Sequence, residues 1–261
     1  MTTDLSQTLG PHPQARQIFQ EMGLQYPEER RLVEATVEHY PFFQEFLPEF
    51  LHVFAALVDG FTAGRTLFLC GNGGSFADCI HMAGELMKTF KQKRPLSDAE
   101  KLPFAGLEFG DILTEHLEKG LPCLVLGLNP SLNSAVQNDT QLSAIQYAQE
   151  LYALGHPGDM LLGISTSGNA LNVRYAVSTA KALGMTTIGL TGKTGGKLAD
   201  VVDIAIKSSE TETYLIQQQH IIVYHTLCLM LESRFFSSLQ QPGNHPQPLT
   251  LPQEVMSHDT P

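Results

Sequence analysis

Four side chains on two predicted helices have the chemistry to move protons or to bind a metal ion. His81 and Glu85 are four residues apart, so on a helix they share one face. Gln217 and His225 are eight residues apart on the second helix, which places them two turns apart and about 80° around its axis. Each pair could therefore line one cavity.

These four side chains suit two kinds of chemistry. Two imidazoles, a carboxylate and an amide oxygen form a donor set that a divalent metal accepts. Glu85 and His225 could also act as a base and an acid. The residues alone leave plainer interpretations open, because a His/Glu pair on an exposed helix is commonly solvated. His225 lies in the apolar run IIVYHTLCLML and could be a core histidine, and the role of His220 on the same helix is open too.

A glycine-rich segment at 70–75 (CGNGGS) is a candidate anion-binding loop. It follows an apolar run and opens a predicted helix. Its glycines let the backbone approach an anion, and the helix N-terminus offers unpaired N–H groups. A tight turn that needs a positive φ is the alternative interpretation. The loop residues concerned are Asn72, Gly73, Gly74 and Ser75.

The segment 163–169 (GISTSGN) is a second candidate loop in the same context. Ser165, Thr166 and Ser167 supply neutral donors, and the dipole of the following helix favours a negative charge. The alternative is that one hydroxyl caps the helix while the others are solvated. Neither loop has the lysine of a Walker A motif, which disfavours hydrolysis of nucleoside triphosphates.

Short apolar runs alternate with helical patterns along the middle of the chain. This alternation predicts an α/β fold in which a parallel sheet is covered by helices on both faces, with ligands beyond the carboxyl ends of the strands. The predicted strands are 66–70, 121–128, 159–165, 185–192 and 201–206, and the predicted helices are 75–90, 140–154, 170–183 and 213–236.

Four stretches lie outside this alternation. Residues 1–27 contain a weak amphipathic segment, and 28–63 reads as two helices with a break near Pro48. Residues 96–120 are too long and too polar for an ordinary crossover loop. The tail 237–261 is rich in Pro, Gln and Ser, which predicts disorder.

Composition narrows the class of protein. With 261 residues, 43% apolar and 16% charged, the chain suits one folded domain with extensions. Its formal net charge of -11 makes direct nucleic-acid binding a poor expectation. The sequence has no apolar run long enough for a membrane span and no signal-peptide pattern, so we expect a cytoplasmic protein. Its four scattered cysteines, Cys70, Cys79, Cys123 and Cys228, are expected to be reduced core residues.

Four segments resemble the bacterial phosphoheptose isomerases, which belong to the sugar isomerase (SIS) proteins. These segments occur in the family's order over about residues 45 to 236. They are 70–86 (CGNGGSFADCIHMAGEL), 158–173 (GDMLLGISTSGNALNV), 190–200 (LTGKTGGKLAD) and 216–225 (IQQQHIIVYH).

The resemblance implies a fold and an activity. It implies a single SIS domain over 45–236 with an insertion at 96–120, preceded by a helical extension over 1–44. The implied architecture is a flavodoxin-like three-layer sandwich with a five-stranded parallel sheet, assembled as a homotetramer with sites at subunit interfaces. The implied reaction is the aldose–ketose isomerisation of sedoheptulose 7-phosphate to glycero-manno-heptose 7-phosphate through an enediol.

The resemblance also implies roles for individual residues. Glu85 and His225 would form the proton-transfer pair, and His81, Glu85, Gln217 and His225 would bind one zinc ion per subunit. The implied contacts with the phosphorylated sugar are Asn72, Gly73, Gly74, Ser75, Glu85, Asn138, Asp139, Ser165, Thr166, Ser167 and Gln217.

The chain departs from the family pattern near the implied pocket. Ala170 replaces a serine that follows the second loop's asparagine, Tyr214 stands where a small or acidic residue is common, and Phe76 stands where a histidine is common. These changes leave the identity of the sugar open. A related branch of the family binds the replication initiator, so the alternative function is a non-catalytic sugar-phosphate module that docks onto a partner protein.

Overall fold

The computed structural model describes residues 5, 9–142 and 144–237, and its centre is a five-stranded parallel sheet. The strand order β2-β1-β3-β4-β5 is the flavodoxin-like order, so the predicted fold class is confirmed. The strands are β1 (Leu67–Gly71), β2 (Cys123–Val125), β3 (Met160–Ser165), β4 (Thr186–Thr191) and β5 (Ile204–Lys207).

The sheet is buried on both faces, as its continuous apolar strands predict. Every residue of β1 and β3 is buried. Successive side chains of a strand point to opposite faces, and in β1 Leu67 and Leu69 enter one core cluster while Phe68 enters the other. Each face of the sheet therefore needs its own helical layer.

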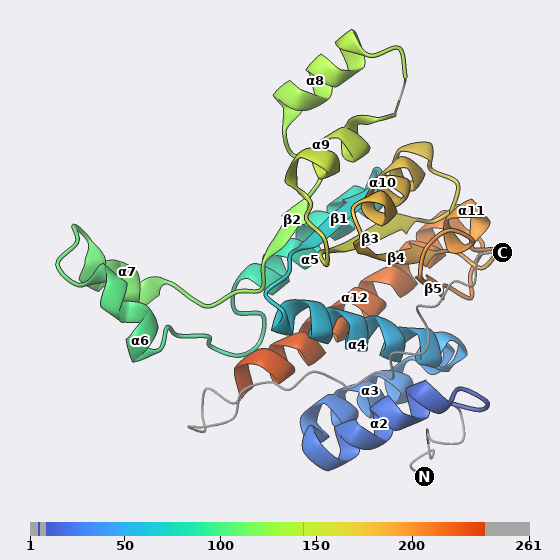
Figure 1. The fold of residues 1–261 in the computed structure, drawn as a ribbon. Helices are drawn as coiled ribbons and strands as arrows, with labels where there is room; N and C mark the ends of the chain where they lie inside the picture. Colours follow the sequence, from blue (N-terminus) through green and yellow to red (C-terminus); the bar gives the residue numbers. More distant parts are fainter. Residues whose placement is uncertain (1–4, 6–8, 143, 238–261) are drawn as a thin grey trace.

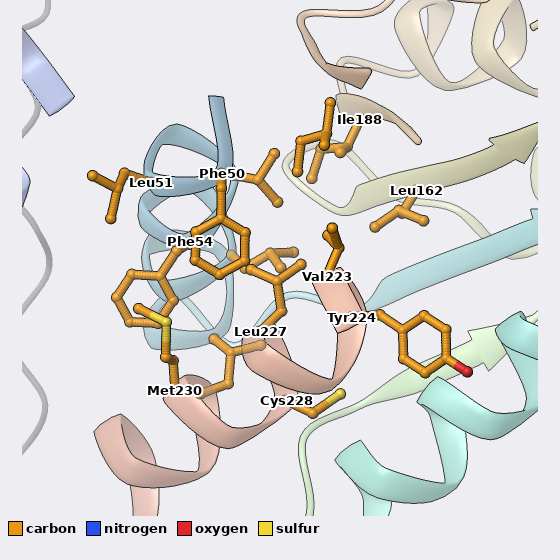
Figure 2. Packing of buried hydrophobic residues seen from close by; sticks show 14 of the residues in the cluster. Phe50, Leu51, Phe54, Leu162, Ile188, Val223, Tyr224, Leu227, Cys228 and Met230 are labelled. Atoms are coloured by element: carbon orange, nitrogen blue, oxygen red, sulfur yellow. The ribbon is translucent and has the colours of Figure 1, made fainter. Parts of the chain in front are cut away.

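One layer consists of α4 (Leu47–Thr62), α5 (Gly74–Met87) and α12 (Thr213–Phe236) (Figure 1). Figure 2 shows the aromatic side chains of α4 beside Val223 and Leu227 of α12, with Leu162 of the sheet nearby. This larger core holds α5 and α12 against the sheet, and these two helices carry the four candidate acid–base and metal-binding residues.

The opposite layer consists of α9 (Gln146–Leu154), α10 (Leu171–Ala182) and the short α11 (Gly196–Ala199). Tyr147 and Leu151 of α9 and Val173 of α10 pack in the second core cluster, against Phe68 of β1. The register pairs Gly71 of β1 with Ile164 of β3. The two candidate loops therefore leave the sheet side by side, at the point where the strand order reverses.

The N-terminal helices α2 (Pro13–Gln25) and α3 (Pro27–His39) pack outside α4 and α12. Glu29 of α3 accepts two hydrogen bonds of 2.6 Å from the buried Arg234 guanidinium of α12. The break expected near Pro48 lies earlier, in the 3₁₀ helix Pro41–Phe46. Pro48 instead stands in the first turn of α4, where its missing N–H leaves no helical hydrogen bond unmade.

Residues 96–120, the expected insertion, form an arm that projects from the body (Figure 1). It contains α6 (Asp98–Lys101), the 3₁₀ helix Leu102–Phe104 and α7 (Gly110–His116). A second projection, α8 (Pro130–Asp139), was not expected from the sequence. Its only buried residue is Val136, so the apolar periodicity that marks a helix is weak there.

Three expectations concern the cysteines, the C-terminal tail and membrane spans. All four cysteines are buried and unpaired. Residues 238–261, most of the predicted disordered tail, lie outside the described residues. Over the described ranges, no helix has both the length and the apolar character to span a membrane.

Candidate active site

His81 is the middle member of a row of three polar side chains between α5 and α12. Its Nε2 atom lies 3.2 Å from Glu85 Oε1, one turn along α5, and 3.4 Å from His225 Nε2 on α12. The His81 and His225 rings meet edge to face, with centroids 4.8 Å apart. The Glu85 side chain is 19% exposed and the His81 side chain 43% exposed, so the row opens to solvent on one side.

His225 is shielded by the aromatic ring of Phe90, whose centroid lies 5.5 Å from the imidazole centroid. Burial lowers the pKa of His225, and the neighbouring His81 lowers it further, while Glu85 acts in the opposite direction. The lowered pKa favours a neutral imidazole at neutral pH. A neutral imidazole can both accept and donate a proton, which suits acid–base work.

Gln217 lies over the first turn of α5. A Cβ built on Gly74 would stand 2.2 Å from Gln217 Nε2, so only glycine leaves room for the amide. Gly73 precedes this turn with φ 55°, in the region that glycine tolerates. The Gln217 side chain of α12 is therefore brought onto the first candidate loop.

The first loop is closed by a reciprocal amide pair. Asn72 Nδ2 donates to Asn172 Oδ1 at 2.9 Å, and Asn172 Nδ2 donates to Asn72 Oδ1 at 2.8 Å. Tyr147 donates to the carbonyl of Gly71 from the α9 side. Asn172 was not anticipated from the sequence, because its role depends on α10 lying beside the first loop. The pair ties the end of β1 to the start of α10.

The second loop is packed against the segment that follows β4. Gly168 has φ 64°, and a Cβ there would lie 1.9 Å from the carbonyl oxygen of Gly195. Gly192 N–H donates to the carbonyl of Thr166 at 3.0 Å. The N-cap of α10 is Ala170, which supplies no side-chain acceptor, so none of the loop hydroxyls caps this helix. The capping alternative is therefore not what the structure has.

Comparison with known proteins decides the family. A family model described as the SIS domain matches residues 121–192. Phosphoheptose isomerase from Crocosphaera subtropica is 37% identical over 186 residues, 71% of this chain and 82% of the relative. The enzyme of the same name from Geotalea daltonii is 36% identical over 193 residues, 74% of this chain and 88% of the relative.

The chain belongs to the phosphoheptose isomerase family. The likeness extends to solved structures. A phosphoheptose isomerase from Neisseria gonorrhoeae superposes with a TM-score of 0.58 at 27% identity, over 82% of this chain and 98% of that one. The Francisella tularensis structure gives a TM-score of 0.59 at 24% identity, over 81% and 96%, and supports the fold alone. The family assignment makes the protein an isomerase.

The row of side chains fits part of the metal site that the phosphoheptose isomerase resemblance implies. Tetrahedral zinc with bonds of about 2.0–2.1 Å sets neighbouring donor atoms about 3.3 Å apart. The two distances from His81 Nε2, 3.2 Å and 3.4 Å, are close to that spacing. In the described part of the chain, no ion pair joins Glu85 to His225, and no group of three His, Cys, Asp or Glu side chains is placed so that it could hold a metal ion by itself. The donor types suit a divalent ion, and the two spacings at His81 match a zinc site. The remaining pair, Glu85 and His225, forms no contact of that kind in the described residues.

Two side chains beneath this row were missed by the sequence analysis. Tyr224 points from α12 toward α5 (Figure 2), and its hydroxyl lies 3.0 Å from His81 Nδ1 and 3.3 Å from Asp78 Oδ1. Burial raises the pKa of Asp78, against the opposing effects of the Tyr224 hydrogen bond and of His81. Asp78 stands three residues before His81, a spacing that shares a helix face, and that was the available signal.

Other expected site residues lie elsewhere. Asn138 and Asp139 end α8, which projects beyond α9 (Figure 1), and the Asn138 amide donates to Asp139 at 2.8 Å. Within one chain, Asn138 and Asp139 are not brought together with Glu85, His81 and His225. His220 faces the sheet, with Nε2 3.1 Å from the carbonyl oxygen of Thr191. Burial lowers the pKa of His220 to about 4, so it is a neutral core histidine outside the row.

Proposed function

We propose that the protein interconverts sedoheptulose 7-phosphate and glycero-manno-heptose 7-phosphate through an enediol. The support is the family, whose members carry the name phosphoheptose isomerase, together with the Glu85–His81–His225 row. A proton must move between C1 and C2 of the sugar, and this requires a base near carbon and an acid near oxygen. The carboxylate and imidazole of the row supply both.

Glu85 is the proposed base and His225 its partner at oxygen. Glu85 would remove the C1 proton of the ketose, and His225 would protonate the C2 oxygen as the enediol forms. In the second half, the C1 hydroxyl would return its proton to His225, and Glu85 would deliver to C2 the proton that it took from C1, which completes the aldose. The lowered pKa of His225 suits this exchange, because the imidazole is then neutral at the start of the cycle and becomes neutral again when it takes the C1 hydroxyl proton.

The phosphate belongs, in this proposal, at the two glycine-containing loops. No hydroxyl caps α10, so its first N–H groups can donate to an anion along with Ser165, Thr166 and Ser167, except that of Val173, which donates to Asn172 Oδ1. The first loop, Asn72 to Ser75, follows β1, next to the loop that follows β3. It would contact the sugar from there. Asn138 and Asp139 could join the site of another subunit in the proposed homotetramer.

We also propose one zinc ion per subunit, held by His81, Glu85, Gln217 and His225. The donor types and the two donor spacings at His81 support this assignment. When bound, the ion would polarise the sugar carbonyl. Equilibrium dialysis with zinc, on wild type and on His81→Gln, tests the assignment through stoichiometry.

The activity is tested by incubating the purified protein with sedoheptulose 7-phosphate and measuring the aldose product. Fructose 6-phosphate and ribulose 5-phosphate serve as shorter comparison substrates. The proposal expects turnover of the seven-carbon sugar well above that of the shorter ones. Turnover of a shorter ketose phosphate alone would correct the substrate, and no turnover of any would refute the enzymatic assignment.

A further inference from the structure

Asp78, Tyr224 and His81 form a chain of hydrogen bonds that ends at the proposed active site. Tyr224 is 1% exposed, and its hydroxyl lies within reach of both Asp78 Oδ1 and His81 Nδ1. His81 uses its other nitrogen, Nε2, to face Glu85 and His225. A neutral imidazole carries one proton, so a proton at Nδ1 leaves Nε2 with a lone pair, whereas a proton at Nε2 makes that atom a donor.

Counting donors gives the direction of these hydrogen bonds. A Tyr hydroxyl has one proton, so Tyr224 can donate to Asp78 or to His81 but not to both. The Asp78 carboxylate can only accept, and its Oδ2 atom is buried without a hydrogen-bond partner. If Tyr224 donated to His81, the half-buried Asp78 side chain would lose the hydroxyl donor too, and leaving its desolvated oxygens without any donor is costly. The Tyr224 proton accordingly goes to Asp78.

We propose that Asp78 and Tyr224 are positioning residues that hold His81 in the tautomer protonated at Nδ1. The Tyr224 oxygen then accepts from Nδ1–H, and the Nε2 lone pair faces the Glu85 carboxylate at 3.2 Å. With the proton at Nδ1, the Nε2 lone pair and the Glu85 carboxylate can both donate to one cation. The hydrogen bonds from His81 through Tyr224 to Asp78 thereby leave the Nε2 lone pair available to a metal. A hydrogen-bond partner on the second nitrogen orients a ligating histidine in the same way.

This inference deepens the proposed function and rests on its zinc site, yet the tautomer can be measured without zinc. Tyr224→Phe removes the hydroxyl and keeps the ring that packs on His81. Asp78→Asn replaces the acceptor with an amide that can donate. Tyr152→Phe makes the same chemical change on the exposed face of α9, where the side chain is 69% exposed, and serves as the matched control.

The first measurement is the ¹⁵N spectrum of histidine-labelled, metal-free protein, with His81 assigned from the spectrum of His81→Gln. We expect Nδ1–H in wild type and Tyr152→Phe. In Tyr224→Phe the proton should move to Nε2, where Glu85 accepts it, and Asp78→Asn should shift the population the same way. Nε2–H in wild type, or an unchanged Nδ1–H in Tyr224→Phe, would overturn the proposal.

The second measurement is zinc affinity by competition with a chelator. Tyr224→Phe should weaken zinc binding about 10–100-fold, the usual effect of losing an outer hydrogen-bond partner, while Tyr152→Phe should not. Equal affinity of wild type and Tyr224→Phe would overturn the positioning role. Wild type that binds no zinc would refute the metal in the proposed function, and the tautomer spectra would still decide the role of Tyr224.

Discussion

The buried guanidinium of Arg94 joins the Glu232 carboxylate on α12, with Nε 2.9 Å and Nη2 2.8 Å from Oε1. The same guanidinium donates to the carbonyls of Leu86 and Glu85 at the end of α5. One side chain therefore links the two helices whose crossing brings His81 beside His225. Glu232 also accepts three backbone N–H groups from the segment 90–92, which leads into the arm.

Arg94→Met should strongly destabilise the protein. Glu232 would remain buried with its charge partner removed, and breaking a buried pair in this way costs about 3–5 kcal/mol. Urea unfolding measures the loss. Arg31→Met is the matched control, because Arg31 pairs with Glu28 at an exposed site where such pairs contribute about 0–1 kcal/mol. Equal losses for the two variants would contradict a structural role for the Arg94–Glu232 pair.

Gly74→Ala should disturb the site with little damage to the fold. The added methyl group meets Gln217 Nε2 at 2.2 Å, so the amide must leave its place over the first turn of α5. We expect weaker zinc binding and slower turnover. Gly84→Ala, later on the same helix, meets no atom within 4 Å and should raise helix stability by about 1 kcal/mol. Chelator competition and turnover on both variants test the difference, and unchanged values in Gly74→Ala would count against Gln217 as a ligand.

His220 should make stability fall at acidic pH. Its pKa is lowered from 6.5 to about 4 in the folded protein, because burial disfavours the charged ring. The unfolded chain therefore binds more protons between these values, so the free energy of unfolding decreases as pH falls from 6.5 toward 4. The contribution is about 3 kcal/mol.

His220→Gln removes this titration while retaining a group that can donate to the Thr191 carbonyl. Denaturant unfolding of both proteins at several pH values between 4 and 6.5 checks the prediction. The variant should show a flatter pH dependence by about the amount given above. Parallel curves for wild type and variant would mean that His220 titrates normally or opens to solvent.

The sheet could be predicted from the sequence because its strands are continuous apolar runs, such as TLFLC before the first loop. The helix α8 could not, since PSLNSAVQND buries only Val136 and shows no apolar stripe. The structure also moves the helix break from Pro48 to the preceding 3₁₀ helix. Proline signals a boundary, but its preference for a first helical turn decides on which side the helix lies.

Part of the candidate site could also be predicted from the sequence. The spacing of His81 and Glu85 on one helix defines a shared face, and the structure places His225 of α12, also a candidate from the sequence, beside that face. Tyr224 and Asn172 escaped the sequence analysis because their partners lie on other elements, more than 90 residues away in the chain. Such roles depend on how α5 meets α12 and how α10 meets the first loop, which no local pattern encodes.

The most direct test of the central claim is sedoheptulose 7-phosphate turnover by wild type and by Glu85→Gln, each with and without added zinc. Glutamine keeps the size of the side chain and removes the base, so loss of a general base should lower the rate about 100-fold or more. Turnover in wild type that collapses in Glu85→Gln, with zinc present, is the predicted result. Equal turnover in the two proteins would contradict the assignment of Glu85, and no turnover in wild type would contradict the proposed reaction.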